Sequence, residues 1–177
     1  MAKELKDYVV TIPDFPAPGV MFRDVTSVIQ DPDGLQLAVD TMQDLVKDVD
    51  YDVIIGAESS GFIFGAPIAY NQHKALVLAR KQGKLPRETV SETYALEYGT
   101  ATLEIHKDAI KPGQKVLIVD DLIATGGTMM AGWRLLKRLG AAPVEGVAVM
   151  DLPELGGSAH LRAAGLPLHT LLEFDGQ

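Results

Sequence analysis

Short apolar runs recur along the chain, and they do not alternate with polar residues. Unbroken apolar runs of strand length are typical of strands that are covered on both faces, as in a parallel sheet. The pattern therefore predicts buried strands in a mainly parallel sheet. The runs are Tyr51–Ile55, Ala75–Ala79, Lys115–Val119 and Gly146–Met150.

Segments with helical periodicity separate these runs. From Leu35 to Val49 the apolar residues recur every three or four positions, and Asp31 or Asp33 could cap the helix that this spacing predicts. Because strands and helices alternate, we expect an α/β fold whose central, mainly parallel sheet is flanked by helices. Further helices are predicted over Phe62–Gln72, Thr128–Leu139 and Ser158–Ala164, and Gly140 and Gly165 end the last two.

Two regions interrupt the alternation. Residues 8–30 hold three prolines around two phenylalanines, which predicts an irregular but ordered loop that could act as a small N-terminal hood. Residues 81–106 contain two extended segments, Val90–Tyr98 and Thr100–His106, which turn at Gly99. This pattern predicts a β-hairpin that projects from the sheet. A long insertion of this kind in a compact domain is usually functional.

Length and composition limit the alternatives. The chain has 177 residues, of which 47% are hydrophobic, and this predicts a single domain over residues 1–177. A net charge of −8 argues against a nucleic-acid partner, which would require excess positive charge. Cysteine is absent, which excludes disulfides and a cysteine nucleophile. We see neither a secretory signal nor an apolar run that could span a bilayer, so we expect a cytoplasmic protein without a membrane partner.

The strongest chemical signal is the segment Val116–Thr128. It joins an apolar strand, the acidic pair Asp120 and Asp121, and a glycine-rich turn that opens a helix. Such a turn offers free backbone N–H groups and a positive helix end to a phosphate. The neighbouring carboxylates can accept hydrogen bonds from a sugar diol. The segment therefore predicts a site for a ribose 5-phosphate, and the sequence does not rank the two carboxylates. The phosphate motifs of ATP-hydrolysing and dinucleotide-binding proteins are absent.

This segment resembles the phosphoribosyl pyrophosphate motif of the type I phosphoribosyltransferases. Four more segments are similar, in the same order, to those of the adenine-specific members of that family. The resemblance covers nearly the whole chain and implies that adenine and phosphoribosyl pyrophosphate react to give AMP and pyrophosphate, a reaction of purine salvage. It also implies a homodimer, and Mg²⁺ that is bound through the substrate's pyrophosphate rather than by a dedicated protein ligand. The four segments are Phe15–Asp24, Gly83–Pro86, Leu96–Gly99 and His106–Ile110.

The resemblance also implies roles for individual residues. Glu97 becomes the catalytic group that handles the proton of the base. Phe22 and Leu152 sandwich adenine, and the backbone of Met21 and Arg23 reads its Watson–Crick edge. The residues that would bind phosphoribosyl pyrophosphate are Asp120, Asp121, Ala124, Thr125, Gly126, Gly127, Thr128, Glu58, Ser59, Ser60, Gly61, Arg80, Lys81, Lys84 and Tyr98.

Two further features concern the pyrophosphate. Five basic residues and no acidic one lie between Lys74 and Arg87, which predicts a local basic patch that stabilises a leaving pyrophosphate. Gly56–Gly61 is a second turn between a strand and a helix that could hold an anion on backbone amides. The family usually has Arg where this chain has Ser60, and a hydroxyl cannot replace the paired, charged hydrogen bonds of a guanidinium. The nearby basic residues are candidates to compensate.

Two alternatives remain open at this point. The first is another type I enzyme, specific for xanthine or hypoxanthine, although the segment around Phe22 and Arg23 resembles the adenine version. The second is a non-catalytic regulator that senses a ligand with the same fold. Regulators of that kind carry an added DNA-binding domain, and this acidic chain has no spare length for one.

Overall fold

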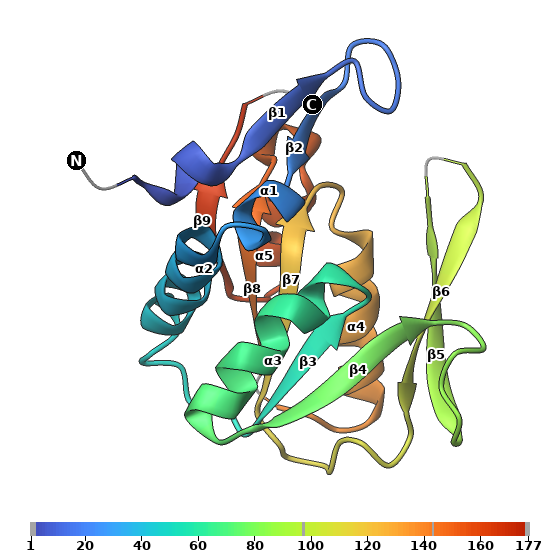
Figure 1. The fold of residues 1–177 in the computed structure, drawn as a ribbon. Helices are drawn as coiled ribbons and strands as arrows, with labels where there is room; N and C mark the ends of the chain where they lie inside the picture. The colour runs from blue at the N-terminus through green and yellow to red at the C-terminus, as the bar shows by residue number, and fades with distance from the viewer. Residues whose placement is uncertain (1–2, 97, 143, 176–177) are drawn as a thin grey trace.

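A seven-stranded sheet forms the centre of the molecule (Figure 1). The computed structural model describes residues 3–96, 98–142 and 144–175. The strand order is β5-β6-β4-β3-β7-β8-β9; all neighbours from β4 to β9 are parallel, whereas β6 runs antiparallel to both β4 and β5. The expected mainly parallel sheet is therefore confirmed. Its strands are β3 (Val53–Ala57), β4 (Ala75–Lys81), β5 (Thr89–Ala95), β6 (Thr100–His106), β7 (Val116–Ile123), β8 (Val144–Asp151) and β9 (Leu168–Glu173).

Helices cover both faces of this sheet (Figure 1). In β7, Ile118 packs with α4 on one face, and its neighbour Leu117 packs with α2 and α3 on the other. Both faces of the strand are thus buried, which explains its unbroken apolar sequence. No helix in the described ranges is long and apolar enough to cross a membrane. The helices are α1 (Thr26–Ile29), α2 (Pro32–Leu45), α3 (Ser60–Gln72), α4 (Gly127–Arg138) and α5 (Gly157–Ala163), with 3-10 turns η1 (Leu5–Tyr8) and η2 (Pro153–Leu155).

The start of α2 distinguishes between the two predicted capping residues. The Asp31 side chain accepts hydrogen bonds from the backbone N–H groups of Asp33 and Gly34, at 2.9 and 3.4 Å, so Asp31 is the cap. Pro32 occupies the first helical position, where its missing N–H costs nothing. The three other predicted helices, α3, α4 and α5, match to within two residues at each end, whereas α2 ends at Leu45 rather than at Val49 and the sequence did not predict α1.

The hood differs from its prediction. Residues 8–30 are not irregular throughout, because β1 (Val10–Pro13) and β2 (Met21–Asp24) form a two-stranded antiparallel sheet, and α1 follows. The prolines and the exposure of these strands hid the pattern from the sequence. The hood lies beyond the end of β7, at the edge where the parallel strands finish (Figure 1).

The predicted hairpin is confirmed as β5 and β6, which pair from Thr89↔His106 to Ala95↔Thr100. β6 also joins the central sheet through two pairs with the end of β4. Glu104 of β6 is buried, and its carboxylate accepts hydrogen bonds from the Gly83 N–H at 2.8 Å and the Thr89 hydroxyl at 3.0 Å. The hairpin is thereby fixed to the loop after β4, and its tip rises on the same side as the hood (Figure 1).

Candidate functional site

The turn after β7 forms a small cavity of about 110 Å³, lined by Asp120 and residues 122–129. Gly126 begins α4 with φ +83°, a conformation that favours glycine, and no side chain caps the helix there. The first backbone N–H groups of α4 therefore have no partner within the helix and can donate to a ligand. Together with the positive end of the helix, they supply the donors that the predicted anion site requires.

The two carboxylates belong to β7 itself, because the strand continues to Ile123. The sequence placed them after the strand, and that position is corrected here. Asp120 is 9% exposed, and its Oδ1 accepts the Asp121 N–H at 2.8 Å. Burial, together with the Asp121 charge, raises the pKa of the Asp120 carboxyl well above its usual value. Asp121 is half-buried and therefore more accessible than Asp120, although Asp120 and not Asp121 lines the cavity.

The second candidate anion site lies where β3 leads into α3. The peptide bond between Glu58 and Ser59 is cis, and no side chain caps the start of α3 at Ser60. Gly61 permits close packing, because a Cβ at this position would lie 2.5 Å from the carbonyl oxygen of Val119 in β7. The backbone amides of this turn therefore lie against the strand that carries the acidic pair.

Glu58 organises the basic residues beside this turn. Its buried carboxylate accepts Arg80 Nε at 2.8 Å and Lys84 Nζ at 3.2 Å. Burial alone would raise the pKa of Glu58, but these two hydrogen bonds outweigh it and lower that pKa below its usual value. The pairing positions two cations next to the candidate anion site, and it also uses part of their charge.

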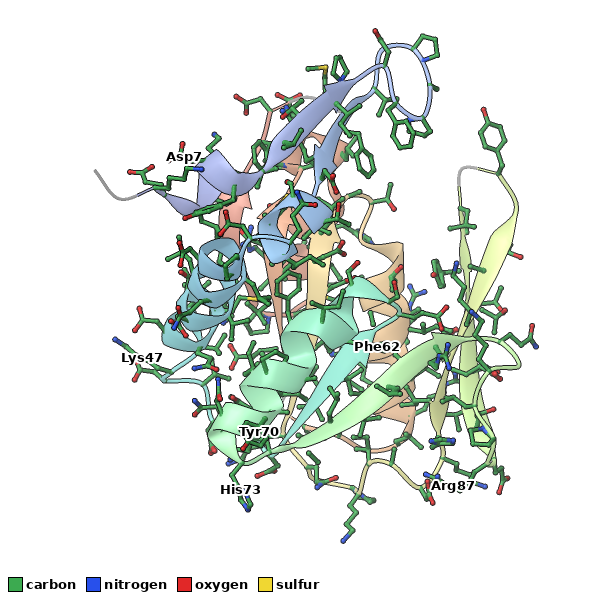
Figure 2. The ribbon with its side chains drawn as sticks, viewed as in Figure 1. Asp7, Lys47, Phe62, Tyr70, His73 and Arg87 are labelled. Carbon is green, nitrogen blue, oxygen red and sulfur yellow. The ribbon has the colours of Figure 1, made fainter. Side chains whose placement is uncertain are left out.

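The prediction that the basic residues between positions 74 and 87 form one patch is wrong. Lys74 precedes β4, and its Nζ lies 5.5 Å from the ring centroid of Tyr51. Arg87 lies at the far end of the hairpin, where it pairs with Asp108 at 3.2 Å (Figure 2). Lys74 and Arg80 lie at opposite ends of β4, and the loop after β4 separates Arg80 from Arg87. Among the described cations of this segment, Arg80 and Lys84 are the two that pair with Glu58 beside the turn at residues 58–61.

The predicted base-binding residues come from two segments that meet the same edge of the sheet. Met21 and Phe22 are exposed on β2 in the hood, and Phe15 packs edge-on against Phe22 with ring centroids 5.1 Å apart. Leu152 follows β8, is buried, and donates its N–H to the carbonyl oxygen of Ile123 at 3.0 Å. Arg23 is half-buried, and its Nη1 donates to the Thr11 hydroxyl at 2.6 Å.

The hairpin contacts the phosphate-type turn directly. Tyr94 of β5 shares a hydrogen bond with the Thr128 hydroxyl at 3.2 Å, and its ring lies where a Cβ on Gly127 would be, at 3.0 Å. The contact of Tyr94 joins residues 34 positions apart, and no sequence pattern predicted it. Tyr98 is 87% exposed near the hairpin tip. The predicted catalytic residue Glu97 lies outside the described residues.

Gly157 is a further residue that the sequence analysis missed. It starts α5 and donates its N–H to the Ala124 carbonyl oxygen at 3.2 Å. The paired glycines at 156 and 157, between a turn and a helix, were the available signal. Gly157 thus packs directly against the backbone of the turn at residues 124–128.

Metal-binding side chains do not gather at this edge. Within the described ranges, no group of three or more His, Cys, Asp or Glu side chains lies close enough to hold a metal ion. The carboxylates beside the two candidate anion sites are Asp120, which lines the first, and Glu58, which already pairs with Arg80 and Lys84 at the second. A divalent cation here would therefore take most of its ligands from a bound phosphate and from water.

Comparisons with known proteins agree with this geometry. A family model described as a phosphoribosyl transferase domain matches residues 25–157. The adenine phosphoribosyltransferase of Agathobacter rectalis is 57% identical over 175 residues, which is 99% of this chain and 99% of that protein. The enzyme of the same name from Paracidovorax citrulli is 55% identical over 174 residues, 97% of this chain and 95% of that protein.

Solved structures give the same result. The crystal structure of adenine phosphoribosyltransferase from Thermoanaerobacter pseudethanolicus matches with a TM-score of 0.90 and 40% identity, over 96% of this chain and 98% of that one. The Saccharomyces cerevisiae enzyme, solved with an imino-altritol bisphosphate and adenine, matches with a TM-score of 0.87 and 38% identity. That match covers 95% of this chain and 96% of the yeast chain.

Proposed function

This chain belongs to the phosphoribosyl transferase family, among its adenine phosphoribosyltransferases, and from this we propose that its site transfers the 5-phosphoribosyl group of phosphoribosyl pyrophosphate to adenine. The products are AMP and pyrophosphate. The observation that carries the proposal is the uncapped turn after β7, which faces a cavity shared with Asp120 and follows the strand that also carries Asp121. It combines anion-binding amides with acceptors for a ribose diol in one segment.

Two backbone turns would divide the phosphates of the substrate. The turn at residues 124–128 takes the 5-phosphate, and Asp121 accepts a ribose hydroxyl beside it. Asp120 supports Asp121 from the buried side through its hydrogen bond to the Asp121 N–H. The turn at residues 58–61 takes the pyrophosphate, with Arg80, Lys81, Lys84 and Tyr98 around it. Cations fixed there stabilise the negative charge that develops as the pyrophosphate leaves.

The base would lie between the hood and the end of β8. Phe22 and Leu152 would stack on its two faces, and the backbone of Met21 and Arg23 would read its edge. Glu97 would handle the proton of the base as a general acid–base group.

Mg²⁺ fits this site as an ion held mainly by the substrate. Asp121 offers a half-exposed carboxylate beside the phosphate turn, and one or two carboxylates with substrate phosphates are the usual Mg²⁺ environment. When bound, the ion neutralises part of the pyrophosphate charge. We assign it no dedicated protein ligand.

One assay tests the proposed function. Purified protein is incubated with phosphoribosyl pyrophosphate, Mg²⁺ and one base at a time: adenine, hypoxanthine, guanine or xanthine. We expect adenine to react fastest and to give AMP and pyrophosphate in equal amounts. Faster reaction of another base would reassign the substrate, and no reaction with any base would favour the regulator.

We propose a homodimer that acts in the cytoplasm. Ile63 and Tyr70 lie two turns apart on α3, and both are exposed, with 87% of Tyr70 accessible. Exposed apolar side chains along one helix face are typical of an interaction surface. Light scattering of the purified protein, with the Tyr70→Ser variant beside it, tests the assembly, and cell fractionation tests the location.

Replacing Asp121 with Asn is expected to weaken binding of phosphoribosyl pyrophosphate. The change removes a charged acceptor and keeps the shape of the side chain. A charge-assisted hydrogen bond is worth about 1.5–3 kcal/mol, and the lower part of that range applies because Asp121 is half-exposed, which gives about 10- to 30-fold. Calorimetric titration with the substrate, at fixed Mg²⁺, measures the effect. Unchanged affinity would remove Asp121 from the ribose site.

Replacing Ser60 with Arg is expected to tighten phosphoribosyl pyrophosphate binding about tenfold, because a guanidinium adds charged, paired hydrogen bonds where a hydroxyl gives a neutral one. Glu58 would compete less strongly for the new Arg, since its charge is already shared with Arg80 and Lys84. The same pairing leaves those cations less able to replace the missing Arg.

Ser60→Gln is the matched control, because it adds length and donors without charge. Dissociation constants of the three proteins are compared at two salt concentrations. We expect the gain of Ser60→Arg to shrink at high salt, and the Gln form to resemble the wild type. Equal or weaker affinity of the Arg form would mean that the turn is already compensated.

A further inference from the structure

Three buried side-chain atoms have no hydrogen-bond partner among the described residues. They are Nε of Arg23 in the hood and both carboxylate oxygens of Asp151 at the end of β8. Asp151 is 0% exposed. An isolated buried carboxylate is costly, and an opposite charge nearby is the usual compensation. The unpartnered atoms here carry opposite charges, and the proposed reaction uses neither side chain.

Both residues contact Phe174. The guanidinium carbon of Arg23 lies 4.7 Å from the ring centroid of Phe174. The Phe174 N–H donates to the carbonyl oxygen of Asp151 at 3.0 Å. Arg23 and Asp151 thus approach one phenylalanine, one from its ring and one from its backbone.

The other donors of Arg23 hold it in this place. Nη1 donates to the Thr11 hydroxyl at 2.6 Å, and Nη2 donates to the carbonyl oxygen of Asp175 at 3.3 Å. The first bond stays within the hood, and the second joins the hood to the chain just after β9. Nε is the buried nitrogen of Arg23 that has no hydrogen-bond partner among the described residues.

Asp151 lies at the carboxyl end of β8, between two neighbouring strands. It pairs with Ile123 of β7 on one side and with Glu173 of β9 on the other. The next residue is Leu152, which we place against one face of the base. Asp151 therefore links the strand of the phosphate turn, the wall of the base site and the chain that receives Arg23.

We propose that Asp151 is a positioning residue for base recognition: its buried charge and the Arg23 guanidinium form an electrostatic pair beside Phe174 that fixes β2 over the base site. The proposal deepens the proposed function and rests on it. The backbone of β2 would read the edge of adenine, yet β2 pairs only with β1, over four residues. Backbone donors must be placed to within about 1 Å to act efficiently, so an anchor on the β2 side chain controls them.

A double-mutant cycle tests this pair. Asp151→Asn, Arg23→Met and the double variant are compared with the wild type for kcat, the KM of adenine and the KM of phosphoribosyl pyrophosphate. Each single change is expected to raise the adenine KM about tenfold and to leave the other KM within about twofold. The double variant is expected to resemble the worse single variant, because the pair acts as one unit.

Glu173→Gln is the matched control, since Glu173 is an exposed carboxylate on β9 at the position that pairs with Asp151 of β8. We expect it to leave both KM values unchanged. If Asp151→Asn does not fold, Arg23→Lys answers the same question, because it keeps the charge but lacks Nε, and it should raise the adenine KM selectively.

Three outcomes would overturn the proposed pair. They are an unchanged adenine KM in Asp151→Asn, a rise of the adenine KM in the double variant equal to the product of the two single rises, or equal changes in the KM values of adenine and phosphoribosyl pyrophosphate. Failure of the proposed function is separate, because it would show as no adenine transfer by the wild type. The thermal unfolding midpoints of the same four proteins would then decide the coupling, since a real pair makes the two shifts non-additive.

Discussion

Replacing Glu97 with Gln is expected to lower kcat with adenine by about 10²- to 10⁴-fold, the usual contribution of a general acid–base group. The dissociation constant of phosphoribosyl pyrophosphate should stay nearly the same, because we assign Glu97 to the proton of the base and not to a phosphate. The neighbouring described residues support a role at this place. Tyr94, lower on the same hairpin, contacts Thr128 of the phosphate turn, so the stem of the hairpin is anchored beside the reacting groups.

Glu88→Gln is the matched control for this experiment. Glu88 precedes β5 at the opposite end of the same hairpin, where it is exposed and pairs with Lys107 at 3.4 Å. Steady-state turnover and substrate titration are measured for both variants. If turnover and binding fall by the same factor in Glu97→Gln, or if neither changes, Glu97 does not handle the proton.

The buried part of the fold could be predicted from the sequence, whereas the exposed part could not. β7 and β8 have neighbours on both sides and helices on both faces, and their apolar runs report this burial directly. β9 lies at the edge of the sheet, and most of Leu168–Glu173 is only half-buried, so its apolar signal was weak. β1 and β2 stabilise each other by pairing over residues that the sequence marks as proline-rich and exposed.

A similar division applies to the site. The phosphate turn is contiguous, so one segment, Val116–Thr128, carried both its strand and its chemistry. The ion pairs of Glu58 with Arg80 and Lys84 join residues more than twenty positions apart, and their spacing in the chain does not predict them. For the same reason, charges that are close in sequence, such as those at residues 74 and 87, were wrongly grouped into one patch.

Gly157→Ala is expected to lower kcat/KM for phosphoribosyl pyrophosphate about 100-fold, because it forces the phosphate turn out of place. A Cβ on Gly157 would lie 2.4 Å from the Ala124 carbonyl oxygen, 2.5 Å from the Thr125 carbonyl carbon and 2.6 Å from the Gly126 nitrogen. Ordinary contact begins near 3.4 Å, so the two segments must separate by up to about 1 Å. All three atoms are backbone, and no side-chain rotation can relieve the clash.

Gly132→Ala provides the control for this change, because it adds the same methyl group on α4. There the new Cβ would lie 3.8 Å from Leu103 and 3.9 Å from Ile118, which are ordinary contacts, and alanine suits a helix better than glycine by about 0.5–1 kcal/mol. We expect Gly132→Ala to keep full activity and to unfold at an equal or higher temperature. Activity is compared at a temperature where circular dichroism shows that both variants are folded. Wild-type kcat/KM in Gly157→Ala would mean that the turn tolerates a shift of about 1 Å, and the geometry of its backbone amides would then not control substrate binding.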